Sequence, residues 1–162
     1  TQQRTILSLT QEHSSSEQLV LPRLQGKVLV VDDMDDIRLL IGHNCQSFGL
    51  DVSYASNGLQ ALEAFKLASA QGKFFDLILM DIHMPELDGQ RAFDQLRAGP
   101  GRNAAIPVIA LTADSMRGDQ EKYLARGFNG YVSKPIDQSS LLTVVEDCLT
   151  RAATHDDQRR KA

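Results

Sequence analysis

Short apolar runs alternate with longer stretches of helical periodicity five times between residues 27 and 150. The apolar runs are KVLVV (27–31), DVSYA (51–55), FDLILM (75–80), IPVIAL (106–111) and GYVS (130–133). Their length and composition are typical of β-strands. The central runs are apolar almost throughout, as strands covered on both faces must be. The pattern therefore predicts an α/β fold, in which helices cover both faces of a parallel sheet.

The stretches between the runs carry apolar residues at the spacing of one helix face. In the first stretch these residues are Ile37, Leu40, Ile41, Cys45 and Phe48, and in the second, less strictly, Leu59, Leu62, Ala64 and Phe65. We expect Gly49 to end the first helix and Asp137 to cap the last.

The two ends of the chain differ from this alternating body. Residues 1–25 include a polar, Ser-rich stretch and are predicted to be a linker that is partly disordered. Residues 26–150 form the predicted domain, and residues 151–162 a C-terminal tail that is too short for a second domain. Because the chain starts with Thr1 rather than Met, we expect a fragment of a longer protein.

Composition and charge narrow the classes of function. The chain has 162 residues, 42% of them hydrophobic, and no apolar run near the ~20 residues needed to span a bilayer. We therefore expect no membrane contact by this segment and a cytoplasmic location. Residues 27–150 hold 11 basic and 17 acidic groups, a balance that disfavours nucleic acid as a partner. Cys45 and Cys148 fall on apolar helix faces and are predicted to be buried free thiols.

Polar side chains lie at the carboxyl ends of four of the five predicted strands. Asp32 and Asp33 follow the first strand, Asp81 ends the third, Thr112 follows the fourth and Lys134 follows the fifth. Each residue alone is better explained as a cap, a turn residue or a surface charge. Because these strand ends share one edge of a doubly wound sheet, where ligands bind, the set as a whole favours a functional site.

The residue types at this edge indicate phosphate chemistry. Three crowded carboxylates repel one another, so they either take up protons or hold a cation. Oxygen ligands without His or Cys suit a hard ion such as Mg²⁺ (or Mn²⁺). A carboxylate can attack phosphorus to form an aspartyl phosphate, while a metal and an ammonium neutralise the phosphoryl oxygens. Asp81 is then the nucleophile, Lys134 the ammonium, and Thr112 a hydroxyl donor to a phosphoryl oxygen.

The segments VLVVDD, LILMDIHMPELDG, IPVIALTA and YVSKPI occur in the order and spacing of one known family. In these motifs residues 26–150 resemble the receiver domains of two-component response regulators. The resemblance implies a flavodoxin-like doubly wound (βα)5 fold with a five-stranded parallel sheet in the order 2-1-3-4-5. It also implies that Asp81 is the phosphoacceptor, that Asp33 binds the metal directly, and that Asp32 acts largely through water.

Other residues take their expected roles from the same resemblance. The backbone carbonyl of His83 would be the third protein ligand of the metal, and the His83 side chain would lie at the rim of the site with Asp114. Thr112 and Tyr131 match the pair that switches on phosphorylation. Lys134 precedes Pro135, where the family often has a cis peptide bond.

The implied function is a receiver that catalyses its own phosphorylation and dephosphorylation, taking the phosphoryl group from a phosphohistidine. No histidine here (His13, His43, His155) lies in a kinase phosphodonor sequence, so the donor should be a histidine kinase or a histidine phosphotransfer domain. The motifs favour the receiver of a hybrid sensor histidine kinase that takes part in a phosphorelay. The resemblance thus allows a cytoplasmic location either free or as the cytoplasmic part of a membrane-bound sensor kinase.

Three alternatives stay open from the sequence. The nearest is a stand-alone response regulator. A phosphatase with an aspartyl-phosphate intermediate would place a second Asp where this chain has His83. A flavin-binding module would need a Ser/Thr/Gly-rich phosphate loop after the first strand, and none follows it.

Overall fold

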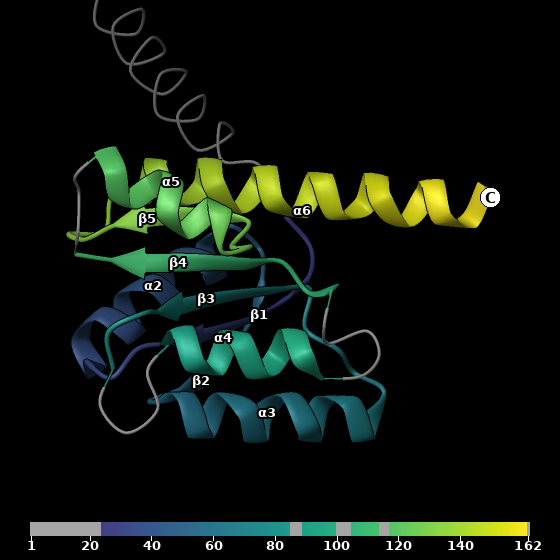
Figure 1. Ribbon diagram of the computed structural model, residues 1–162, viewed down its shortest axis with the longest axis horizontal. Helices are drawn as coiled ribbons and strands as arrows, with labels where there is room; N and C mark the ends of the chain where they lie inside the picture. The colour runs from purple at the N-terminus through teal and green to yellow at the C-terminus, as the bar shows by residue number, and fades with distance from the viewer. Residues whose placement is uncertain (1–23, 85–88, 100–104, 114–116, 162) are drawn as a thin grey trace, which may run out of the picture.

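The computed structural model describes residues 24–84, 89–99, 105–113 and 117–161, in which five strands alternate with helices (Figure 1). The strands are β1 (Lys27–Val31), β2 (Asp51–Ala55), β3 (Leu77–Asp81), β4 (Val108–Thr112) and β5 (Gly130–Ser133). The helices are α2 (Asp35–Ser47), α3 (Gly58–Gln71), α4 (Gly89–Ala98), α5 (Arg117–Ala125) and α6 (Gln138–Lys161). The alternation predicted from the apolar pattern is confirmed.

All five strands are parallel and lie in the order β2-β1-β3-β4-β5, as the resemblance implied. Their register places Asp81 beside Leu111 of β4, and Thr112 beside Ser133 of β5. The strands point the same way, with their arrowheads on the left of Figure 1. The carboxyl ends of the strands therefore form one edge, at which all the polar groups singled out above arrive.

The core has two layers, one on each face of the sheet. Alternate residues of β1 illustrate this, because Leu29 belongs to one layer and Val30 to the other. The first layer packs against α3, α4 and Tyr123 of α5, and the second against α2 and α6. All residues of β3 and β4 are buried, which confirms the prediction that the central strands are covered on both faces.

Two predicted strands begin later than expected and end one residue further on. The runs 75–80 and 106–111 correspond to β3 at Leu77–Asp81 and β4 at Val108–Thr112. Pro107 has no backbone N–H to donate to the ladder, which explains the late start of β4. Asp76 precedes β3 and uses its carboxylate to accept a hydrogen bond from the Lys27 N–H at 2.8 Å. Thr112 is consequently the last residue of β4 and does not follow the strand.

The predicted helix faces are right in part. Ile41 and Cys45 of α2 and its C-cap residue Phe48 are buried as expected, but Leu40 is 48% exposed. Leu40 directly precedes Ile41 and so lies about 100° around the helix from it. The prediction that Leu59 of α3 is buried is also wrong, since this residue is 51% exposed. The buried side of α3 is instead formed by residues at helical spacing: Ala61, Phe65 and Ala68.

The helix ends follow the predicted punctuation. Gly49 comes after α2 with φ +102°, a conformation that favours glycine. Asp137 caps α6, because its Oδ2 accepts a hydrogen bond from the Ser140 N–H at 3.0 Å. α6 continues to Lys161, so residues 151–161, predicted as a tail, extend the last helix. Residues 1–23 lie outside the described residues, and the domain boundaries at 25 and 150 stay predictions.

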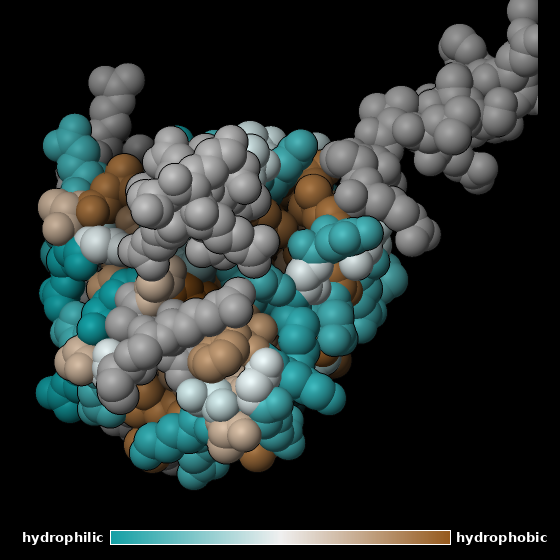
Figure 2. Space-filling view, turned by 90° about the vertical axis from the view of Figure 1, so that its right-hand side faces the viewer, coloured by the Kyte–Doolittle hydropathy of each residue, from teal (hydrophilic) through white to brown (hydrophobic). Residues whose placement is uncertain are grey.

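Both cysteines are buried free thiols, as predicted, and neither suits redox chemistry. Burial raises the pKa of Cys45 to about 12 and that of Cys148 to about 11, so both stay protonated at neutral pH. Within the described part of the chain, no helix combines the length and apolar character needed to cross a bilayer. Figure 2 shows the face at the amino ends of the strands, where hydrophilic and hydrophobic residues are interspersed.

Candidate functional site

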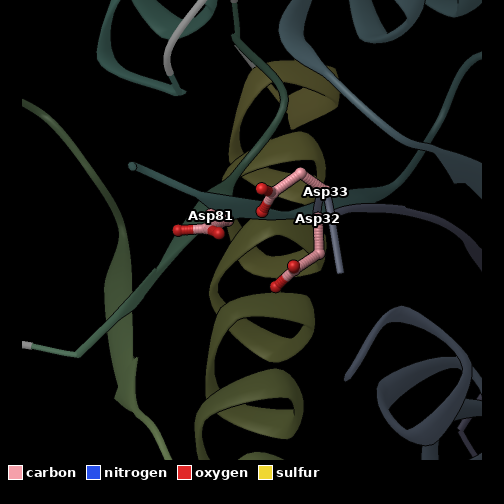
Figure 3. A group of neighbouring side chains, drawn as sticks. All are labelled: Asp32, Asp33 and Asp81. Carbon is pink, nitrogen blue, oxygen red and sulfur yellow. The ribbon is translucent and has the colours of Figure 1, made fainter. Parts of the chain in front are cut away.

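Three carboxylates meet where the sheet reverses its strand order. Asp32 and Asp33 follow β1, and Asp81 ends the neighbouring strand β3. One oxygen from each side chain lies within 4.8 Å of the others, and Figure 3 shows the three side chains gathered in one place. Asp32 and Asp81 are 0% and 4% exposed, whereas Asp33 is open to solvent. The cluster is therefore a buried acidic site with one accessible side.

Lys134 brings a positive charge to the two buried carboxylates. Its Nζ lies 2.9 Å from Asp32 Oδ2 and 3.1 Å from Asp81 Oδ2. Its backbone N–H donates to the carbonyl of Thr112 at 2.8 Å, which holds the end of β5 against the end of β4. The peptide bond to Pro135 is cis, as the resemblance suggested. One ammonium among three carboxylates leaves the cluster with net negative charge.

The hydrogen bonds of the carboxylates leave Asp32 Oδ2 with the Lys134 ammonium as its ion-pair partner. Asp81 Oδ1 accepts from the His83 N–H at 3.0 Å, and Asp81 Oδ2 accepts from Lys134. Asp32 Oδ1 accepts from the Met34 N–H at 2.9 Å. Asp32 Oδ2 is buried and lies close to Lys134, yet among the described residues it has no hydrogen-bond partner of suitable geometry. A buried oxygen with a free lone pair, in an all-oxygen cluster, fits a hard cation.

Burial and charge shift the pKa values at the site. Burial raises the pKa of Asp81 above its ordinary value, and the neighbouring Asp32 charge raises it further. The bonds from His83 N–H and Lys134 oppose this rise without cancelling it. Burial alone would lower the pKa of Lys134, but its interactions with the two carboxylates outweigh burial and raise it. Lys134 therefore stays charged, and the charge on Asp81 is one that an added cation would stabilise.

A glycine lies directly against the backbone of Asp81. A Cβ on Gly89, the first residue of α4, would be 2.0 Å from the Asp81 carbonyl oxygen and 2.7 Å from Ile82 Cα. No side chain fits at these distances, so glycine is needed for α4 to begin beside β3. Gly89 closes the quoted motif LILMDIHMPELDG, where the sequence indicates a break after the strand but not this close approach to Asp81.

Arg38 is a second residue at the site whose role the sequence does not indicate. Its Nη1 donates to the backbone carbonyl of Asp32 at 2.8 Å, and its Nη2 donates to the carboxylate of Asp35. The only signal in the sequence is the spacing of Asp35 and Arg38, since residues three apart on a helix are neighbours. The contact with Asp32 depends on how β1 meets α2.

The structure brings together Asp32, Asp33, Asp81 and Lys134, as the sequence predicted. For the remaining predicted residues that it describes, the structure gives the burial and the position in the fold. Thr112 is buried at the end of β4, and Tyr131 is half-buried in β5 beside Ala110. His83 is exposed, and so is His43 on α2. Asp114 lies outside the described residues, and nothing is described of the His155 side chain.

Comparison with known families matches residues 28–146 to the family described as "Response regulator receiver domain". This match covers more than half of the chain and coincides with the sheet and its helices. It includes all the clustered residues.

Individual proteins agree with this match. The chain is 38% identical over 122 residues to "Hybrid signal transduction histidine kinase I" of Dictyostelium discoideum, covering 74% of this chain and 7% of that protein. It is 37% identical over 139 residues to "Signal transduction histidine-protein kinase BarA" of Escherichia coli K12, covering 86% and 14%. The solved structure of CheY4 of Vibrio cholerae, 30% identical, superposes with a TM-score of 0.65 over 77% of this chain and 99% of that one. The chain thus spans a small part of both kinases and nearly all of CheY4.

Proposed function

This chain belongs to the family of response regulator receiver domains, and on that premise we propose that Asp81 accepts a phosphoryl group from a phosphohistidine. The observation that carries the proposal is the position of Asp81, buried at the end of β3 and 3.1 Å from the Lys134 ammonium. In the transfer, a carboxylate oxygen of Asp81 attacks phosphorus, the phosphorus–nitrogen bond of the donor breaks, and the imidazole leaves as a neutral base once it is protonated. Lys134 stabilises the charge on the phosphoryl oxygens.

Asp32, Asp33 and Asp81 would hold a Mg²⁺ (or Mn²⁺) ion. The free lone pair on the buried Asp32 Oδ2 and the net negative charge of the cluster support this. The ion would neutralise charge on the transferred phosphoryl group. We assign Asp33 to direct ligation, Asp32 to ligation largely through water, and the third protein ligand to the His83 carbonyl.

Thr112 and Tyr131 would convert phosphorylation into a change of surface. The main-chain bond from Lys134 to Thr112 couples the group that binds phosphate to the end of β4. Each new charge-assisted hydrogen bond to the phosphoryl group can contribute about 1.5–3 kcal/mol. That is enough to bias a two-state element made by the α5–β5–α6 side of the domain, with Tyr131 moving as Thr112 moves. His83 and Asp114 would influence how water reaches the phosphoryl group.

We assign the chain to the receiver part of a hybrid histidine kinase that acts in a phosphorelay on the cytoplasmic side. Its partner would be a histidine kinase or a histidine phosphotransfer domain. The similarity to two proteins named as histidine kinases supports this context. A stand-alone response regulator is the alternative, and a gene product that contains a kinase core would decide between them.

Transfer from a labelled phosphohistidine donor tests the proposal. A histidine phosphotransfer domain carrying labelled phosphate, mixed with the chain and Mg²⁺, should lose its label while one phosphoryl group appears on each receiver. Asp81→Asn should receive none. Steady hydrolysis of a small phosphate ester, with no label retained on the chain, would instead support the phosphatase alternative.

A further inference from the structure

Arg38 links the first turns of α2 to the end of β1. Its guanidinium donates to the Asp32 carbonyl at 2.8 Å and to the Asp35 carboxylate, and its side chain is only 16% exposed. The planar fork of arginine allows it to serve both acceptors at once. The carbonyl it binds belongs to the peptide unit that joins Asp32 to Asp33. A hydrogen bond there fixes the plane from which the Asp33 side chain departs.

Lys134 holds the Asp32 carboxylate of the loop between β1 and α2 at 2.9 Å, but it makes no contact with the Asp32–Asp33 peptide that the structure describes. Met34, the N-cap residue of α2, makes no side-chain capping bond. The Asp32 N–H bonds to the carbonyl of Ala55 at 3.2 Å, and Asp32 Oδ1 accepts from the Met34 N–H. The carboxylates of Asp32, Asp33 and Asp81 repel one another when no cation is bound. Asp33 is exposed, and a rotated Asp32–Asp33 peptide would carry its side chain away from the cluster towards solvent.

We propose that Arg38 is a positioning residue of the metal site, which holds the Asp32–Asp33 peptide so that both carboxylates converge with Asp81. The inference rests on the proposed role of these carboxylates in binding Mg²⁺. Arg38 touches neither the metal nor the phosphoryl group, and its effect is transmitted through the backbone. Residues of this kind, which orient metal ligands, typically change metal affinity about 10- to 100-fold when they are removed.

A purely structural role makes a different prediction. If Arg38 only stabilised α2 through its ion pair with Asp35, its loss would lower the unfolding temperature equally with and without metal. The affinity of the folded protein for Mg²⁺ would then stay the same. If Arg38 positions the ligands, the affinity itself falls.

Calorimetric titration of the folded chain with Mg²⁺ alone tests the inference. Arg38→Met keeps most of the aliphatic stem but removes every donor, and should weaken Mg²⁺ binding about 10- to 100-fold. Arg126→Met is the matched control, because Arg126 pairs with Asp94 at 3.3 Å on the exposed surface away from the cluster. The affinity of Arg126→Met for Mg²⁺ should equal that of the parent.

Arg38→Lys tests the fork itself and also carries the test if Arg38→Met does not fold. A single ammonium is drawn to the charged Asp35 carboxylate and releases the neutral Asp32 carbonyl, so the affinity should fall severalfold. Parent-like affinity in either folded Arg38 variant would overturn the positioning role alone. A parent chain that binds no Mg²⁺ would overturn the proposed metal site together with this inference.

Discussion

Replacing Lys134 with Met would remove the ammonium from between Asp32 and Asp81 while keeping a side chain of similar length. Both carboxylates are nearly or fully buried, and the Lys134 side chain is 17% exposed. Removing one partner of a buried ion pair leaves an uncompensated charge and typically destabilises a protein by about 3–5 kcal/mol. We expect the lower end of this range, about 3 kcal/mol at neutral pH, because the cluster has an accessible side. In a domain of this size that loss lowers the unfolding temperature by roughly 6–12 °C.

The pH dependence of the variant has a definite sign. The pKa of Asp81 in the folded parent already lies above its ordinary value of 3.8, because burial raises it. Loss of Lys134 raises that pKa further. At pH values between the ordinary pKa of Asp81 in the unfolded chain and its raised pKa in the folded variant, the folded state binds more protons than the unfolded state. The stability of Lys134→Met should consequently increase as the pH falls from neutral towards the ordinary pKa of Asp, and decrease as the pH rises.

Urea unfolding followed by circular dichroism measures these effects. Lys66→Met, at an exposed position on α3, is the control and should leave stability nearly unchanged. Mg²⁺ should restore part of the stability lost in Lys134→Met, since a cation replaces the missing charge. In an Asp81→Asn background the same substitution should cause a smaller loss, because one buried charge is gone. A loss below about 1 kcal/mol, or an equal loss in both backgrounds, would refute the electrostatic reasoning.

Three further predictions concern the site. Gly89→Ala should destabilise the domain by about 1–3 kcal/mol or more and slow phosphorylation, because its Cβ would lie 2.0 Å from the carbonyl of the acceptor residue. Gly99→Ala, whose nearest neighbour is at 3.4 Å, should be far milder, and equal unfolding temperatures for the two would contradict this. Asp33→Ala should weaken Mg²⁺ binding in a titration more than Asp32→Ala does, and equal losses would argue against direct ligation by Asp33. Thr112→Ala should still accept phosphate but show weaker changes in amide exchange across residues 117–136, and changes as large as the parent's would remove Thr112 as the coupling residue.

Much of the fold could be predicted from local pattern, because the apolar runs and the helical spacing are local properties of the chain. The strand order came from the resemblance of four motifs to a family. The clustering of Asp32, Asp33, Asp81 and Lys134 followed from one general rule, that the carboxyl ends of parallel strands share an edge. These predictions needed no knowledge of side-chain contacts.

The rest depended on contacts between segments distant in the sequence or on exact helix rotation. Leu40 and Leu59 are apolar residues of a type that is usually buried, and only the rotation of each helix against the sheet shows that they are exposed. Gly89 and Arg38 act on backbone atoms of Asp81 and Asp32, and no side-chain pattern announces a contact with a backbone carbonyl.

The complete burial of Asp32 and the ammonium placed between two carboxylates likewise became visible only in three dimensions. The buried Asp32 carboxylate and the Lys134 ammonium set the charge balance of the cluster, on which the proposed metal site and the Lys134→Met prediction rest.

The intact mass of the chain, after incubation with Mg²⁺ and a small acyl phosphate, tests the central claim most directly. The parent should gain the mass of one phosphoryl group, and Asp81→Asn should gain none. Asp76→Asn is the control, because it removes a carboxylate directly before the first residue of β3, at the other end of the strand from Asp81. This variant should gain the mass of one phosphoryl group, as the parent does. A parent that gains no mass, or an Asp81→Asn variant that gains as much as the parent, would contradict the assignment of Asp81 as the phosphoacceptor.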